Sequence, residues 1–450
     1  MSPTPSRSPI ERFAGLIVQF VPDAMTASIV LLLALAAFAL ALGTPPLEVA
    51  QAHYKGFWAL LPFTAQMALL IVLGAAAAAS PLFQRMVGAL SQLPRSANQT
   101  VALAVLVVAA CSYCFWALGY GLGPMVAVLF AREAEKRGYA LHFPFFLAIT
   151  FCAGAVWQFG LSSSAPLIIA TPGHFLEKSI GVVPLSRTIF SPAAILDVVL
   201  YLCALIAAGC WLMPRTKHPV SDFPEALQIA QPVPLAAPSA DETFTARLER
   251  HPFFAWVLGV VLALWLAIHF FVQGASLNIN ALNAVLLLSV VLLHGSVKRL
   301  SLALERAATT AWPILVLYPL YAGVAGLIEH TRVGPAMVSL LAGASSPLTF
   351  PTLSAIIGTV FAFFIPSSGA QWALQGAVMV QSSLEVGITV ERGLLAMSVG
   401  DHMGNLISPF WYAIIASVAR LDFRTFFGYG IVFAMIWFVI GALVFTFAPC

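Results

Sequence analysis

The segment Gly400-Asp-His-Met-Gly-Asn-Leu-Ile-Ser-Pro409 interrupts an apolar run near the end of the chain. It combines two ionisable side chains with two glycines, an asparagine and a proline. A second interruption, Gly160-Leu-Ser-Ser-Ser-Ala-Pro166, lies in the first half of the chain. Glycine and proline at these points predict helices that break in mid-course. If the surrounding runs cross a membrane, such backbone is tolerated only where it lines a polar cavity.

The composition of the chain indicates that it lies in a membrane. Hydrophobic residues make up 60% of the 450 positions and charged residues only 9%, whereas a soluble domain carries about 25% charged residues. So little polar surface cannot cover so much apolar volume in water. The basic residues are dispersed and the net charge is only +3, so no nucleic-acid partner is expected. The pair Cys111/Cys114 has no second cysteine pair or histidine cluster, so we predict no metal or redox role for it.

Each interruption follows another polar break in an apolar run. Cys114-Phe-Trp-Ala-Leu-Gly-Tyr-Gly-Leu-Gly-Pro124 precedes the first, and Phe364-Ile-Pro-Ser-Ser-Gly-Ala-Gln-Trp372 precedes the second. Each half therefore has the order span, hairpin, broken span, span. Two such halves in opposite orientation are typical of secondary transporters. We predict an all-α polytopic membrane protein with two inverted repeats, each holding a re-entrant hairpin and a broken transmembrane helix.

The predicted organisation divides the chain into five parts. These are an N-terminal segment with the first span (1–61), a first repeat (62–213, hairpin about 99–136, broken helix about 143–178), a Pro-rich flexible linker (214–250), scaffold spans (251–311) and a second repeat (312–450, hairpin about 351–383, broken helix about 392–419). With the N-terminus and the linker in the cytoplasm, only five of the 21 basic residues face the other side, namely Lys55, Lys178, Arg187, Arg332 and Arg392. This distribution satisfies the positive-inside rule.

The chain resembles the bacterial short-chain fatty acid transporter family, the acetoacetate/butyrate permease type. The resemblance runs over nearly the whole chain and is most specific at Ser164-Ala-Pro-Leu167, Ala170-Thr-Pro-Gly173, Pro366-Ser-Ser-Gly369, Trp372 and Gln375-Gly376. It implies an elevator-type transporter of the ion-transporter superfamily in a bacterial inner membrane, a homodimer, and a small monocarboxylate such as butyrate or acetoacetate as substrate. No cofactor is expected beyond a coupling ion, H⁺ or Na⁺.

The predicted substrate-binding residues lie at the hairpin tips and helix breaks. They are Gln158, Ser162, Ser163, Ser164, Trp116, Ser367, Ser368, Gly369, Trp372 and His402. Broken helices expose N–H groups and positive dipole ends that attract an anion. The two tryptophans are candidates for the wall of an acyl pocket, although packing is the commoner role of aromatic residues in membrane helices.

The predicted ion-coupling residues are Asp401, Asn405, Ser408, Gly119 and Gly121, with Na⁺ as a candidate ligand of Asp401 and Asn405. An ionisable residue inside a span marks a functional site by default, because its burial is costly. The alternative is that Asp401 and His402 pair structurally with each other or with a distant basic residue. Asp197 and His269 lie near span ends, where we predict interfacial positions.

Three other functions stay open at this point. The same fold could carry a dicarboxylate or an amino-acid-like anion. The chain could also be a passive channel, or an intramembrane serine hydrolase built on Gly160-Leu-Ser-Ser-Ser164 with His174 or His402. The sequence lacks a clear nucleophile–base frame, so we expect a transporter that contacts its substrate and lipid and is not an enzyme.

Overall fold

A computed structural model describes residues 24–59, 61–170, 176–230, 243–275, 279–309, 311–336, 345–364 and 368–448. Residues 171–175, which include His174, and residues 365–367, which include Ser367, lie outside these ranges. In the described residues the chain is helical, with no strand. A single segment can cross lipid only as a helix, because a helix satisfies its own backbone hydrogen bonds whereas an unpaired strand does not.

From residue 24 on, the described part of the first half opens with α2 (Ala24–Ala41), α3 (Pro46–Ala59), α4 (Leu61–Ala78) and α5 (Pro81–Ser91). A helix pair follows, α6 (Ala97–Cys114) and α7 (Trp116–Lys136), then the interrupted segment α8 (Phe143–Ala153), η1 (Gly154–Phe159) and α9 (Ser164–Ile169). The short α10 (Glu177–Ile180) and η2 (Leu185–Arg187) lead to the long α11 (Pro192–Trp211).

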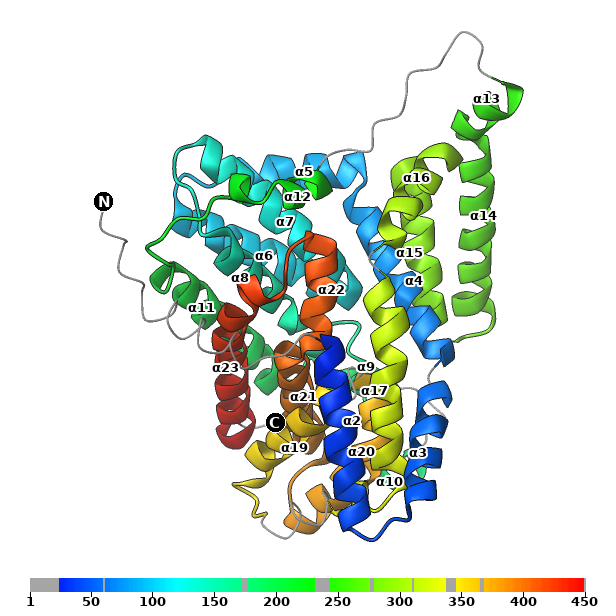
Figure 1. Ribbon diagram of the computed structural model, residues 1–450, viewed down its shortest axis with the longest axis vertical. Coiled ribbons are helices and arrows are strands. Elements are labelled where there is room, and N and C mark those ends of the chain that lie inside the picture. Colours follow the sequence, from blue (N-terminus) through cyan, green and yellow to red (C-terminus); the bar gives the residue numbers. More distant parts are fainter. Residues whose placement is uncertain are drawn as a thin grey trace.

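The second half repeats much of this order. It contains α14 (Phe253–Ala267) with its π-helical extension η5 (Ile268–Val272), α15 (Ile279–His294), α16 (Val297–Ala308) and α17 (Trp312–His330). The pair α19 (Phe350–Phe364) and α20 (Ser368–Val386) precedes the interrupted segment α21 (Val390–Ile407) and α22 (Pro409–Ala419), and α23 (Arg424–Phe447) ends it. Figure 1 shows α6 and α7 in the upper part of the molecule and α19 and α20 in the lower part.

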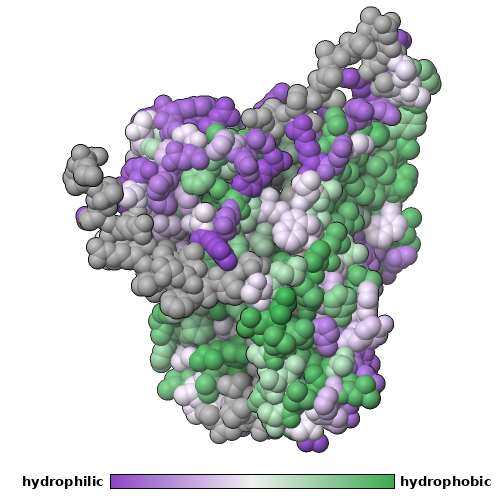
Figure 2. All heavy atoms as spheres, viewed as in Figure 1, coloured by the Kyte–Doolittle hydropathy of each residue, from purple (hydrophilic) through white to green (hydrophobic). Residues whose placement is uncertain are grey.

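Five helices of the described residues are long and apolar enough to cross a membrane: Ala97–Cys114, Phe143–Ile169, Pro192–Trp211, Phe253–Val272 and Arg424–Phe447. They differ in their surroundings. In the apolar 18-residue window of each helix, 94% of the residues are buried for Phe143–Ile169 but only 17% for Phe253–Val272. The interrupted segment is therefore enclosed by protein, whereas α14 and η5 present an apolar surface. Figure 2 shows hydrophobic residues along the right side and lower centre of the molecule, and hydrophilic ones gathered at its upper end.

The linker between the halves is folded over its first part, which differs from the flexible segment that its proline content predicts. Residues 214–230 form three short turns, η3 (Val220–Asp222), α12 (Pro224–Leu227) and η4 (Gln228–Ala230). Glu135 at the end of α7 accepts hydrogen bonds from the backbone N–H and the hydroxyl of Ser221 at 3.2 and 2.5 Å. Val220 and Ala226 are buried. The second part holds the exposed helix α13 (Phe244–Arg250).

The interrupted helix α21 packs closely on α19 because glycine removes side chains from their contact. A Cβ atom on Gly400 would overlap the backbone of Ala355 in α19. A Cβ on Gly358 would in turn press on the carbonyl oxygen of Met397. Backbone-to-backbone packing of this kind is a common way for helices to associate in lipid. It fixes the position of Asp401, the residue that follows Gly400.

Candidate functional site

The two helix breaks have different local structures. The first is a non-helical stretch, Gly160–Ser163, between η1 and α9, and it interlocks with the turn between α6 and α7. There Leu161 N donates to Tyr113 O at 2.8 Å, and the Ser162 hydroxyl accepts from Trp116 N at 2.9 Å. The hydroxyl thereby caps the first turn of α7. The second break is a single residue, Ser408, whose hydroxyl accepts from Phe410 N at the start of α22.

The turn of the first hairpin lies at Phe115, at the start of the predicted break 114–124 and not at its glycines. The helix ends at Cys114, passes through the extended residue Phe115 and starts again at Trp116. Gly119 and Gly121 lie inside α7, where an added Cβ would overlap the Ser112 side chain and the Gly74 backbone respectively. Their small size serves helix packing in this structure.

Four buried polar side chains from three separate elements meet at the breaks, and we refer to Gln158, Ser368, Asp401 and Asn405 as the polar cluster. Gln158 in η1 donates through Nε2 to Asp401 Oδ2 at 2.7 Å, and the same nitrogen lies 3.4 Å from Ser368 Oγ at the start of α20. Asn405 Nδ2 donates to Asp401 Oδ1 at 3.4 Å. All four residues are at most 5% exposed.

Asp401 has amide donors but no basic partner in the part of the chain that the structure describes. The ion pairs found there do not include it. A carboxylate buried among helices is costly unless a partner or a bound cation offsets its charge. The cluster therefore has the chemistry of a site for a small cation or a proton. No group of three or more His, Cys, Asp or Glu that could hold a metal ion is found among the described residues.

An aromatic group adjoins the polar cluster. Trp411 donates through Nε1 to Asn405 Oδ1 at 2.9 Å. Its ring stacks on Tyr120 with the centroids 4.6 Å apart, and the Trp116 ring meets it edge-on at 6.3 Å. These contacts join α22 to α7 directly beside the cluster. The sequence singles out Trp116, but Trp411 and Tyr120 emerge only from the structure.

The other predicted residues lie in different surroundings. Ser163 donates to the backbone oxygen of Gln158 at 2.5 Å, and Ser164 faces Gly369 across the contact between α9 and α20. His402 is fully buried between the rings of Trp157 and Trp437, 5.5 and 5.3 Å away, and neither ring nitrogen has a hydrogen-bond partner among the described residues.

The structural pairing of Asp401 with His402 is therefore not observed. Trp372 is also fully buried, with its ring beside Gly376, and its Nε1 has no hydrogen-bond partner among the described residues.

The structure corrects the interfacial position that the sequence suggested for Asp197 in α11. It is fully buried, and neither carboxylate oxygen has a hydrogen-bond partner among the described residues. The signal was present in the sequence, because an acidic residue six positions into an apolar run faces either lipid or protein. Only the packing of α11 decides that it faces protein.

The fold and this site define a multi-pass membrane protein whose spans enclose a polar site, which is the architecture of a transporter. The family model for short chain fatty acid transporters matches residues 9–448. The chain therefore belongs to the short-chain fatty acid transporter family, and it is a transporter rather than an enzyme.

The matches to relatives and to solved structures cover nearly the whole chain. A candidate short-chain fatty acid transporter of Escherichia coli (strain K12) is 29% identical over 447 residues, covering 97% of this chain and 99% of the relative. One from Haemophilus influenzae is 27% identical, covering 96% and 99%. Among solved structures, Neisseria gonorrhoeae MtrF matches with 15% identity and a TM-score of 0.45, covering 97% of both chains. The Alcanivorax borkumensis YdaH transporter matches with 16% identity and a TM-score of 0.47, covering 95% of this chain and 99% of YdaH.

Proposed function

We propose that the protein is a secondary active transporter of small monocarboxylates such as butyrate and acetoacetate, coupled to H⁺ or Na⁺. The observation that carries this proposal is Asp401, a buried carboxylate held by amides and without a basic partner among the described residues. Its charge needs a proton or a cation that binds and leaves. Such a group gives the ion gradient a place to act during transport.

The polar cluster is the proposed meeting point of the coupling ion and the substrate. Asp401 and Asn405 supply oxygen atoms for the ion, and the N-terminus of the 19-residue helix α20, beginning at Ser368, supplies N–H groups for a carboxylate. Ser164 and Gly369 lie next to the start of α20 and belong to the proposed substrate contacts. Ser367 belongs to the same proposal from the sequence alone, as does Ser408 from its place at the second break.

We propose further that the two halves are inverted repeats. The order of helix pair, interrupted segment and long helix occurs in α6 to α11 and again in α19 to α23. Figure 1 places the two helix pairs towards opposite ends of the molecule, as opposed hairpins require. An inner-membrane location with a cytoplasmic N-terminus, and an elevator motion in a homodimer, belong to this proposal.

The serine hydrolase alternative has no support in the geometry. Ser162 caps α7 and Ser163 bonds to Gln158. His402 makes no hydrogen bond to any described residue. A nucleophilic serine needs a base within hydrogen-bond reach, and His402 does not form such a pair with these serines.

The test is uptake of labelled butyrate and acetoacetate into proteoliposomes with a Na⁺ gradient or a pH gradient imposed separately. We expect accumulation above the outside concentration under one of the two gradients. Equilibration without accumulation would identify a passive channel. No uptake of either compound, with a dicarboxylate or amino-acid anion accumulating instead, would overturn the proposed substrate class.

A further inference from the structure

A cavity lies outside the polar cluster, between the body of α7, the ends of α4, α16 and α22, and the turn η4. About 90 Å³ of it is accessible to the centres of water-sized molecules, within about 650 Å³ of empty space that includes open solvent, which leaves room for a small solute. The walls are largely apolar and include Ala75, Met125 and Val418. None of its lining residues, all within the described part of the chain, is acidic.

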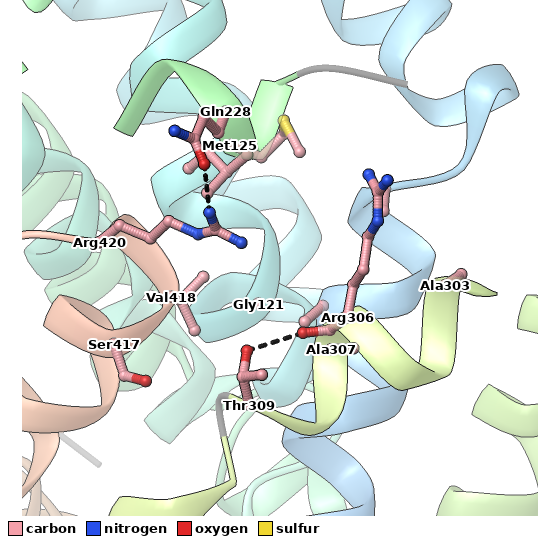
Figure 3. A pocket seen from close by; sticks show the side chains of 13 residues that line it. Gly121, Met125, Gln228, Ala303, Arg306, Ala307, Thr309, Ser417, Val418 and Arg420 are labelled. Atoms are coloured by element: carbon pink, nitrogen blue, oxygen red, sulfur yellow. Dashed lines mark hydrogen bonds between the residues drawn. The ribbon is translucent and has the colours of Figure 1, made fainter. Parts of the chain in front are cut away.

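Two arginines stand on opposite sides of this cavity. Figure 3 shows Arg420, from the end of α22, extending towards the middle of the cavity, and Arg306 on α16 across from it. Arg420 Nη1 donates to Gln228 Oε1 at 2.5 Å. Neither arginine takes part in an ion pair among the described residues. Both guanidinium groups therefore keep donors for an anion, because a guanidinium carries five N–H groups.

The backbone conformation of Arg420 helps to place its side chain over the cavity. It is the only described non-glycine residue with a positive φ, 53°, in the left-handed region. This conformation costs a residue with a side chain roughly 1 kcal/mol. It ends α22 and, together with the bond to Gln228, directs the side chain over the cavity.

The cavity and the aromatic stack share two helices, α7 and α22. Tyr120 precedes Gly121, a lining residue, on α7. Trp411 lies six positions before Ser417, another lining residue, which is about 9 Å along the axis of α22. Trp411 also bonds to Asn405, so the two helices that line part of the cavity, α7 and α22, also carry the stacked rings beside the polar cluster.

We propose that this cavity is a vestibule that binds the carboxylate of a short aliphatic acid before it passes the Tyr120–Trp411 stack. Arg420 and Arg306 bind the carboxylate, and the alanines, Met125 and Val418 contact its alkyl chain. The choice of a short monocarboxylate rests on the proposed function. The site itself rests on the paired arginines, the apolar walls and the absence of acidic residues from the lining.

The test measures occupancy and not transport. Ser417→Cys places a thiol in the lining, and its labelling by a charged maleimide is followed in phosphatidylcholine nanodiscs, with the unsubstituted chain as the background. Butyrate should slow the labelling, and the uncharged analogue butyramide should not. Arg420→Gln or Arg306→Gln in the same background should raise the half-protecting butyrate concentration about tenfold, because each removes a charged hydrogen bond of about 1.5 kcal/mol. Arg424→Gln, at the start of α23 and outside the lining, should leave it unchanged.

Several outcomes would overturn the vestibule. They are no protection by butyrate, equal protection by butyramide, or protection that persists in both arginine variants. Adding phosphatidylglycerol tests the other source of an anion: slower labelling with this lipid but not with butyrate would assign the cavity to a lipid headgroup. Arginine-dependent protection in a protein without uptake would refute the proposed function while retaining the vestibule. Uptake without protection by butyrate would refute the vestibule while retaining the proposed function.

Discussion

Gln158 and Asp401 are separated by 243 positions in the chain, and their side chains are joined by a hydrogen bond of 2.7 Å. Each belongs to one of the two interrupted segments. Ser368, at the start of α20, lies 3.4 Å from the same Gln158 nitrogen. One amide group thus connects both segments and the second helix pair, so a movement of any of these elements changes the surroundings of the Asp401 carboxylate.

The first prediction concerns the charge of Asp401. Asp401→Asn keeps the shape of the side chain and removes the group that offsets a cation or proton. The loss of a charged contact of about 1.5–3 kcal/mol should reduce gradient-driven accumulation of butyrate by roughly ten- to a hundredfold. Uptake into proteoliposomes measures this, with thermal unfolding to verify the fold. Wild-type accumulation by a folded Asp401→Asn protein would remove this residue from the coupling site.

Asp197 provides the matched control. Its carboxylate is as deeply buried as that of Asp401 but has no hydrogen-bond partner among the described residues. Asp197→Asn removes the cost of burying a charge without breaking an observed bond. We expect a Tm equal to or above that of the wild type, and unchanged coupling. A marked loss of stability would show that the carboxylate has a partner beyond the described residues.

The third prediction separates the two contacts of Trp411. Trp411→Phe keeps an aromatic ring against Tyr120 but removes the Nε1 donor to Asn405. A buried acceptor left unpaired costs about 1–3 kcal/mol, and Asn405 becomes freer to turn away from Asp401. The half-saturating concentration of the coupling ion for uptake should rise about tenfold, which corresponds to a loss of 1.4 kcal/mol in ion binding. Tyr120→Phe keeps the stack and serves as the control, with ion dependence like that of the wild type.

The fourth prediction tests the contact that positions Asp401. Gly400→Ala introduces a methyl group where the Ala355 backbone lies, so α19 and α21 must separate. We expect a poorly folded protein or one that has lost accumulation, because overpacking a tight contact typically costs 1–3 kcal/mol or more. Gly88→Ala in α5, where the added methyl meets nothing within 4 Å, should leave yield, Tm and uptake unchanged. Equal behaviour of the two variants would contradict the close packing of these helices.

The sequence by itself determined the class of protein. Sixty per cent hydrophobic residues with 9% charged ones require lipid as the main solvent, and lipid requires helices. The Gly/Pro-containing segments at 160–166 and 400–409 also located both interruptions, because these residue types disturb a helix wherever it packs. Asp401, Asn405, Gln158 and Ser368 were identified in the same way, as polar groups whose burial needs a reason.

Only the tertiary structure decided which of these groups meet. Gln158 turns to Asp401, whereas His402, one residue further along α21, lies between Trp157 and Trp437. Successive residues on a helix point about 100° apart, so the packing around α21 assigns each its partner. The glycines at 119 and 121 fill a helix contact rather than a turn, and Asp197 faces protein rather than an interface. These outcomes depend on tertiary neighbours, 243 positions away for Gln158 and Asp401, which local patterns in the chain do not contain.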